Sequence, residues 1–266
     1  MKHLNFILLL LFVTALLSCD NSVVSPDEEL INPIDQFPQE KQNSYQTEKC
    51  CSSREEQGIS DKYTFPFTME EIKNLPSYTL KLAACQIPED TLINMCTFGL
   101  VDTYYDFPFI STASVHDSKQ NGIRVMESTF NGFRELVQRE DGADKLMQKY
   151  ENAAITDTVE FMHIETMEIT MAYSKLCKNY SAEEQKRMVR LGLKKFNEKK
   201  ALGFSKRALA ETLYLLGCVL YYADYQPFVE FVNNPHNNIG YFISGYPMGA
   251  NLEILEFAEM FLEENG

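Results

Sequence analysis

The sequence of 266 residues contains no tryptophan and four histidines, and it has few basic side chains for its length. With 24 Lys and Arg residues against 38 Asp and Glu residues, its formal net charge is -14. So acidic a chain repels phosphate on average, which excludes non-specific nucleic-acid binding as a function. Hydrophobic residues make up 45% of the sequence, the normal share for a protein that buries one sizeable core.

The common catalytic and metal-binding motifs are also missing. The seven cysteines form no Cys-x-x-Cys pair, which leaves a thioredoxin-like site or a zinc ribbon without support. There is no Gly-x-Ser-x-Gly, no His-Glu-x-x-His and no glycine-rich phosphate loop. We therefore expect no cofactor and name no catalytic residue.

One spacing could serve a metal. Glu160 and His163 form a Glu-x-x-His pair, the spacing with which di-iron helix bundles hold one edge of their site. Such a site needs a second copy of the pair, and the sequence has none. We therefore favour a hydrogen-bonded, half-buried His163 and predict no metal; His116 and His236 do not lie at ligand spacing either.

The first residues have the layout of a secretory signal. Lys2 and His3 precede an apolar run from Leu4 to Leu17, which is too short to span a bilayer comfortably. The run ends at Ser18 and Cys19, and this junction resembles the lipobox of bacterial lipoproteins. The resemblance implies that residues 1–18 are a signal peptide, that Cys19 carries fatty acyl chains, and that the protein is anchored in the cell envelope, at the outer membrane. The alternative is an ordinary cleaved signal followed by a chance cysteine.

Residues 19–62 are predicted to be the lipidated cysteine and a flexible acidic tether. Residues 20–62 contain ten acids, four bases and three prolines, with no sustained periodicity. As a coil, this stretch would have a mean reach of roughly 35 to 40 Å. The acidic segment 26–29 resembles the acidic stretches that follow the cysteine in surface-exported lipoproteins of Bacteroidetes.

Residues 63–266 are predicted to form an all-α body, either an irregular multi-helix bundle or a short stack of helical hairpins. Apolar residues recur at spacings of three and four, and Ser181 with Glu184 forms a capping box. The stretch Leu213 to Ala223 is apolar on all sides, which is typical of a covered central helix. Further helices are expected from Thr68, from Pro88 toward Asp106, and over 119–138, 143–153, 158–178 and 252–262; Ile239 to Ile243 is the remaining candidate strand.

Two sequence segments of this body, 102–108 and 130–136, resemble uncharacterised helical-domain lipoproteins of Bacteroidetes. The resemblance implies a helical fold and supplies no catalytic residues. Once Cys19 is lipidated, six cysteines remain; Cys85, Cys96, Cys177 and Cys218 lie in apolar helical settings, where a buried free thiol is the commoner state.

A cluster of positive charge interrupts the acidic body. Nine bases and one acid lie between Lys186 and Arg207. One interpretation is a patch for an anionic partner. We favour the other, a solvated helix side that complements the helix dipole and neighbouring acidic helices. The candidate patch residues are Lys186, Arg187, Arg190, Lys194 and Lys195.

A second candidate surface is the glycine-bounded stretch 240–249, predicted to be a loop that carries Tyr241, Phe242 and Tyr246. Together these features predict a membrane-anchored, non-catalytic helical domain that binds an unknown protein or glycan. The alternative is an envelope hydrolase that acts on glycan or peptide through carboxylates which the sequence does not single out.

Overall fold

Helices account for the regular structure, as the spacing of the apolar residues predicts. The computed structural model describes residues 61–155, 158–237, 239–246 and 251–265, and in these ranges it contains α-helices, one 3₁₀ helix and no strand. The all-α class is thus confirmed. The predicted signal peptide, Cys19 and nearly all of the predicted tether lie outside the described residues.

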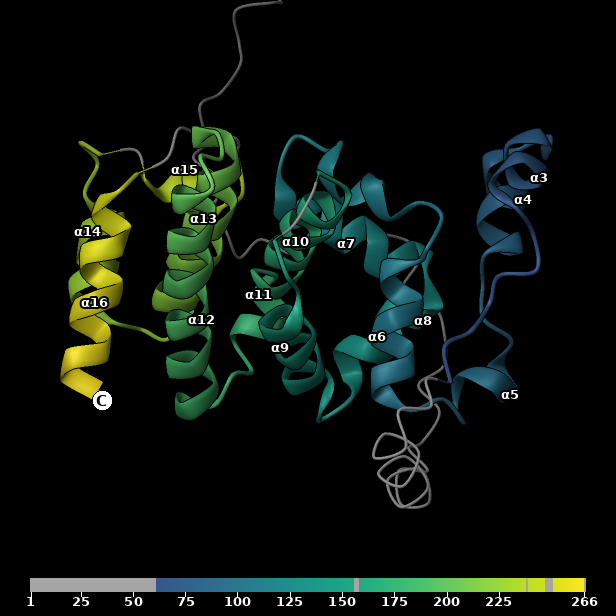
Figure 1. The fold of residues 1–266 in the computed structure, drawn as a ribbon, viewed down its shortest axis with the longest axis horizontal. Helices are drawn as coiled ribbons and strands as arrows, with labels where there is room; N and C mark the ends of the chain where they lie inside the picture. Colours follow the sequence, from purple (N-terminus) through teal and green to yellow (C-terminus); the bar gives the residue numbers. More distant parts are fainter. Residues whose placement is uncertain (1–60, 156–157, 238, 247–250, 266) are drawn as a thin grey trace, which may run out of the picture. The chain divides into compact units, whose positions relative to one another are not determined.

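Figure 1 shows the helices in chain order. They are α3 (Met69–Asn74), α4 (Tyr78–Ala84), α5 (Glu89–Leu92), α6 (Thr97–Tyr105), the 3₁₀ helix η1 (Ile110–Ser114), α7 (Lys119–Thr129), α8 (Asn131–Gln138), α9 (Gly142–Asn152), α10 (Thr158–Met171), α11 (Ser174–Cys177), α12 (Ala182–Ala201), α13 (Lys206–Tyr222), α14 (Gln226–Asn233), α15 (Ile239–Ile243) and α16 (Glu253–Asn265).

Helix starts follow local capping chemistry. At α12 the Ser181 hydroxyl accepts from the backbone N–H of Glu184 at 3.3 Å, and the Glu184 carboxylate accepts from the N–H of Ser181 at 2.7 Å. Thr68 and Glu71 form the same reciprocal pair at the start of α3. Each pair satisfies two backbone amides that have no partner inside the helix. Both predicted starts are confirmed.

The helix predicted from Pro88 toward Asp106 is wrong in one respect, because it is interrupted between α5 and α6. The Arg139 guanidinium donates to the carbonyl oxygens of Leu92 and Met95 at 3.1 and 2.6 Å. The Asp61 carboxylate accepts from the N–H of Cys96 at 2.6 Å. Side chains distant in sequence thus satisfy the backbone groups at the break.

The predicted helix over 119–138 is also divided, at Phe130. This residue has extended backbone angles between α7 and α8, and its side chain is fully buried. Its ring stacks on Phe107, with a centroid distance of 4.2 Å. The stacking lies in the core, so burial of this aromatic pair accompanies the break in the helix.

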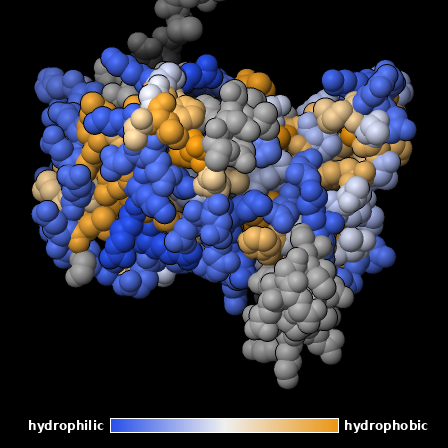
Figure 2. Space-filling view, viewed as in Figure 1, coloured by the Kyte–Doolittle hydropathy of each residue, from blue (hydrophilic) through white to orange (hydrophobic). Residues whose placement is uncertain are grey.

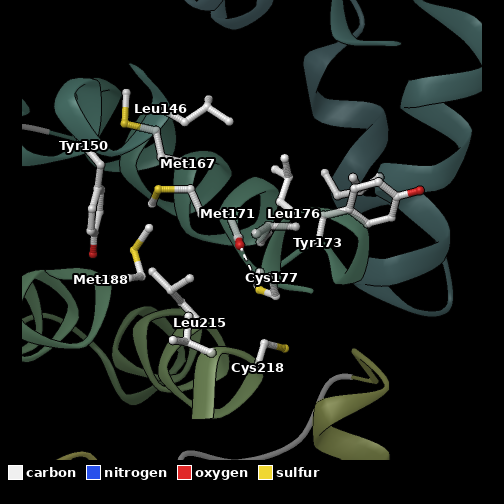
Figure 3. Close-up of a cluster of buried hydrophobic side chains, with 14 of the residues drawn as sticks. Leu146, Tyr150, Met167, Met171, Tyr173, Leu176, Cys177, Met188, Leu215 and Cys218 are labelled. Atoms are coloured by element: carbon white, nitrogen blue, oxygen red, sulfur yellow. Dashed lines mark hydrogen bonds between the residues drawn. The ribbon is translucent and has the colours of Figure 1, made fainter. Parts of the chain in front are cut away.

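Helix α13 is the centre of the fold. It contacts α10, α11, α12, α14, α15 and α16, and every residue from Thr212 to Leu220 is buried. This confirms the predicted covered helix. Figure 3 shows Leu215 and Cys218 of α13 facing Met171, Cys177 and Met188 from the surrounding helices.

The buried thiols are as predicted at three positions. Cys85, Cys177 and Cys218 are free and buried, and Cys177 donates to the carbonyl oxygen of Met171 at 3.2 Å. The prediction for Cys96 is wrong, because this cysteine is disulfide-bonded.

The candidate strand Ile239 to Ile243 is a helical turn, α15. Ile239, Phe242 and Ile243 are buried on one side of it, and α15 contacts α13 and α14. Their spacing of three and four is that of a helix face, whereas a half-buried strand would alternate every second residue.

Candidate functional site

The predicted ligand loop is partly helical, and its three aromatic residues divide between core and surface. Tyr241 is 64% exposed and Tyr246 42% exposed, and their ring centroids lie 6.2 Å apart at an interplanar angle of 76°. Phe242 is 1% exposed and makes an edge contact with Tyr214 of α13. Proposing Phe242 as a ligand contact is therefore wrong, because α15 directs it into the core.

The local backbone explains why the two tyrosines meet. Gly245 has a φ of +87° and ends α15. Its N–H donates to the carbonyl oxygen of Phe242 at 2.9 Å, and the N–H of Tyr246 donates to that of Tyr241 at 3.1 Å. These two bonds define a Schellman motif. In this motif the side chains at the two positions that Tyr241 and Tyr246 occupy typically contact each other.

The turn that carries this tyrosine pair is fixed to the core. The carbonyl oxygen of Gly245 accepts from the N–H of Lys119, the first residue of α7, at 2.9 Å. A Cβ at Gly245 would lie 2.9 Å from that nitrogen and 3.0 Å from the Tyr214 hydroxyl, so only glycine fits. The pair Tyr241 and Tyr246 is therefore held on a supported turn.

The candidate anion patch does not form one solvent-facing surface. Lys195 is 3% exposed and donates to the carbonyl oxygen of Ala153, so its assignment to an open patch is wrong. Arg187 lies 2.6 Å from Asp144 and 2.9 Å from Glu151 of α9, and these bonds raise the pKa of its guanidinium. Both cations bind structural partners.

The other three patch residues lie along one side of α12. Lys186 contacts Glu183 at 2.9 Å, whereas Arg190 and Lys194 are exposed. Lys194 is 3.9 Å from Glu198, and a solvent-exposed ion pair of this kind contributes little to stability. This arrangement favours the interpretation of a solvated helix side with local charge pairing.

A buried polar cluster that the sequence did not reveal lies at the centre of the fold. Glu168 of α10 and Lys199 of α12 are both 0% exposed, and Lys199 Nζ is 2.6 Å from Glu168 Oε2. Glu168 Oε1 also accepts from Tyr150 Oη at 2.9 Å and from Thr212 Oγ1 at 2.8 Å. Burial and the adjacent carboxylate raise the pKa of Tyr150 well above its usual value, so the phenol stays neutral and donates.

This cluster joins α9, α10, α12 and α13 and is sealed from solvent. Lys199 also donates to Thr212 Oγ1 at 3.0 Å and to the carbonyl oxygen of Ala208 at 3.2 Å. A substrate would have no access to Glu168. The cluster therefore acts as a structural tie between helices.

Two further carboxylates lie beside this cluster. Burial raises the pKa of Glu165, and the neighbouring Glu211 raises it further. Burial also raises the pKa of Glu211, whose Oε2 lies 3.3 Å from Lys119 Nζ. Glu211 and Glu168 each have a lysine partner, which is not the arrangement of two unpaired carboxylates that a hydrolase of this kind needs.

Three of the four histidines lie in the part of the chain that the structure describes. His163, predicted to be half-buried, is exposed, as are His116 and His236. The side chain of Glu160 lies outside the described residues. In the part of the chain that the structure describes, no cluster of three or more His, Cys, Asp or Glu residues could hold a metal ion.

The sequence matches no protein-family model, no curated protein and no solved structure. Within the described ranges, no helix is both long and apolar enough to cross a membrane.

Proposed function

We propose that this protein is a lipid-anchored protein of the bacterial cell envelope, held at the outer membrane through Cys19, and that its helical body binds another protein without catalysing a reaction. The observation that carries the binding proposal is the pair of exposed rings, Tyr241 and Tyr246, on a turn fixed to the core. Tyrosines contribute strongly at binding surfaces because they offer a large apolar face and a polar tip at low entropic cost.

The geometry favours a protein over a glycan as the ligand. The two rings are nearly perpendicular, at 76°, so they do not form a flat platform on which successive sugar rings could stack. The chain also lacks tryptophan, the largest aromatic surface available for such stacking. A glycan remains a measurable outcome of the binding test below.

A hydrolase is the less supported function. The most buried carboxylate of the polar cluster, Glu168, is bonded to Lys199, Tyr150 and Thr212, so its acceptor oxygens are occupied. Glu211 lies close to Lys119. In a hydrolase, a catalytic pair of carboxyl groups must be accessible to the substrate, with one group acting as the acid and the other as the base or nucleophile.

The anchor is tested with Cys19→Ala in intact cells. Without a thiol there is no thioether, so the variant should leave the membrane fraction while the native chain stays there. Mass spectrometry of the native protein should find a mature chain that begins at an acylated Cys19. An unmodified amino terminus in a membrane-bound native protein would refute the anchor.

The binding surface is tested by crosslinking in intact cells, followed by mass spectrometry of the captured molecules. Tyr241→Ala and Tyr246→Ala should each weaken capture of a defined partner by about tenfold, since truncating an aromatic anchor typically costs more than about 1 kcal/mol. Leu202→Ala is the matched control, because Leu202 is also exposed but lies at the end of α12. Equal capture of the partner by all three variants would contradict the proposal. If the molecule whose capture the tyrosine variants weaken is a glycan, the ligand is a glycan and not a protein.

A further inference from the structure

A second exposed surface lies at the other end of the chain, on the pair of short helices α3 and α4. We call residues 67–84 the α3–α4 hairpin. Four of its apolar side chains are between 44% and 54% exposed: Phe67, Met69, Tyr78 and Leu80. Figure 2 shows hydrophobic residues at the surface among hydrophilic ones over these helices, at the upper right. Four large apolar side chains are thus exposed within 14 residues of the sequence, on two short helices that contact each other, whereas single exposed apolar residues are normal on a protein surface.

The hairpin contacts the body through few side chains. Ile72 is its one fully buried hydrophobic residue, and Leu82 packs partly against the core. Tyr78 makes an edge contact with Phe109 at 6.0 Å. No residue of α4 is buried, so this helix presents most of its surface outward.

The hairpin is electrically neutral in a strongly acidic chain. Glu70 and Glu71 are balanced by Lys73 and Lys81. Glu71 is also engaged in the capping box with Thr68. The net charge of the whole chain is -14, so this surface is repelled less by an anionic bilayer than the chain's average surface is.

The position of the hairpin in the sequence specifies which apolar environment is nearest. It is the first pair of helices in the described part of the chain, and Phe67 follows the proposed lipid anchor Cys19 by 48 residues. The tether predicted from the sequence ends by Asp61, which is bonded to the body and follows Cys19 by 42 residues. A coil of 42 residues would have a mean reach of roughly 32 to 39 Å. Tethering at this range raises the effective concentration of the hairpin at the bilayer, so weak contact suffices to keep it there.

We propose that the α3–α4 hairpin docks on the bilayer that carries the Cys19 lipid, with Phe67, Met69, Tyr78 and Leu80 in the interfacial layer. This inference rests on the proposed anchor. Phenylalanine and leucine supply apolar area there, and tyrosine fits the boundary because its ring is apolar and its hydroxyl is polar. Lys73 and Lys81 extend toward the headgroups along their aliphatic stems. Docking holds the body at a fixed orientation beside the membrane.

The absence of tryptophan provides a direct test. The full-length lipidated chain is purified from cells as Tyr78→Trp or Leu80→Trp and placed in vesicles of phosphatidylethanolamine and phosphatidylglycerol. Tryptophan at either position should emit at shorter wavelength in vesicles than in detergent-free buffer. Lipids brominated on their acyl chains should lower that emission roughly twofold, since interfacial side chains lie about 5–10 Å deep. Leu202→Trp, at the exposed residue that follows α12, is the control and should show neither effect.

The outcomes separate the hairpin from the anchor. If the protein sediments with the vesicles and its hairpin tryptophan is not quenched, the anchor holds and docking is refuted. If it does not sediment with the vesicles, both proposals fail. A blue shift that grows with protein concentration without vesicles would mean that a second copy covers the hairpin, which also refutes docking. Adding Phe67→Ser to Tyr78→Trp should reduce the quenching, and unchanged quenching would exclude the surface defined here.

Discussion

The centre around α13 and the α3–α4 hairpin are both helical, but they differ in what covers them. Around α13 even a charged pair, Glu168 and Lys199, is removed from solvent and satisfied by neighbours. In the hairpin, apolar Tyr78 and Leu80 are about half exposed. A chain that buries its ions at one place and exposes its large apolar side chains at another is not simply dividing polar from apolar residues. The proposed docking of the hairpin on the bilayer would account for this difference.

Helix length accounts for part of this contrast. Helix α13 has 17 residues, whereas α3 has six and α4 has seven. Helices as short as α3 and α4 are marginal in water and depend on tertiary contacts. In the hairpin those contacts come mainly from Ile72 and Leu82. The following predictions examine how far the two regions differ.

The largest effect is expected from Lys199→Met. This change leaves the Glu168 carboxylate buried without its cation, and it should lower the free energy of unfolding by about 3–5 kcal/mol. The measurement is denaturant unfolding followed by circular dichroism at neutral pH.

The control for this change is the double variant Lys199→Met with Glu168→Gln. The amide keeps an acceptor for Tyr150 and Thr212 and removes the unpaired charge, so most of the lost stability should return. A double variant that is as unstable as Lys199→Met alone would show that the lysine contributes chiefly through packing.

In the hairpin the largest effect is expected from Ile72→Ala. Loss of this buried side chain should cost about 2–4 kcal/mol, but locally, because the hairpin contacts little else. Amide hydrogen exchange should become faster in α3 and α4 and stay unchanged in α13. Met69→Ala, which truncates an exposed side chain, is the control. Faster exchange in α13 would mean that hairpin and centre unfold as one unit.

Local chemistry explains which parts of this fold the sequence predicted. The capping boxes at Thr68 and Ser181 and the all-round apolar run in α13 act over a few residues, so they could be read directly. The breaks at 93–96 and at Phe130 could not, because the side chains that contact the chain there, Arg139 and Phe107, are far away in sequence. The strand predicted at 239–243 was wrong because five residues are too few to distinguish the alternating spacing of a strand from the spacing of a helical turn.

The same reasoning applies to the sites. The buried face of α12 carries Met188, Gly192, Lys195 and Lys199 at spacings of three and four. A lysine on such an apolar face indicates a buried partner, so this spacing was the available signal for the polar cluster. The partner Glu168 could not be predicted, because it lies 31 residues away on another helix.

A smaller effect is expected from pH at the edge of the centre. Burial and Glu211 hold the pKa of Glu165 above its usual 4.5 in the folded state, so the unfolded chain releases this proton first as pH rises. The side chain's contribution to stability is therefore full at low pH and is lost as pH rises through the folded pKa. From acidic to neutral pH, the free energy of unfolding of Glu165→Gln should rise relative to that of the native chain by at most about 1 kcal/mol. The effect is small because Glu165 is partly exposed and water screens its charge. The measurement is urea unfolding at several pH values, and a pH-independent difference would rule out this titration.

The smallest effect is expected from Leu80→Ser. Because Leu80 is about half exposed and no residue of α4 is buried, the free energy of unfolding in buffer should change by about 0.5 kcal/mol or less. Leu216→Ser, at a fully buried position of α13, is the matched control and should cost several-fold more. A large loss of stability in Leu80→Ser would show that the hairpin's apolar surface serves folding. An unchanged stability, together with weaker quenching of a hairpin tryptophan by brominated lipid, assigns that surface to the membrane and completes the contrast with α13, whose apolar residues are covered by the chain itself.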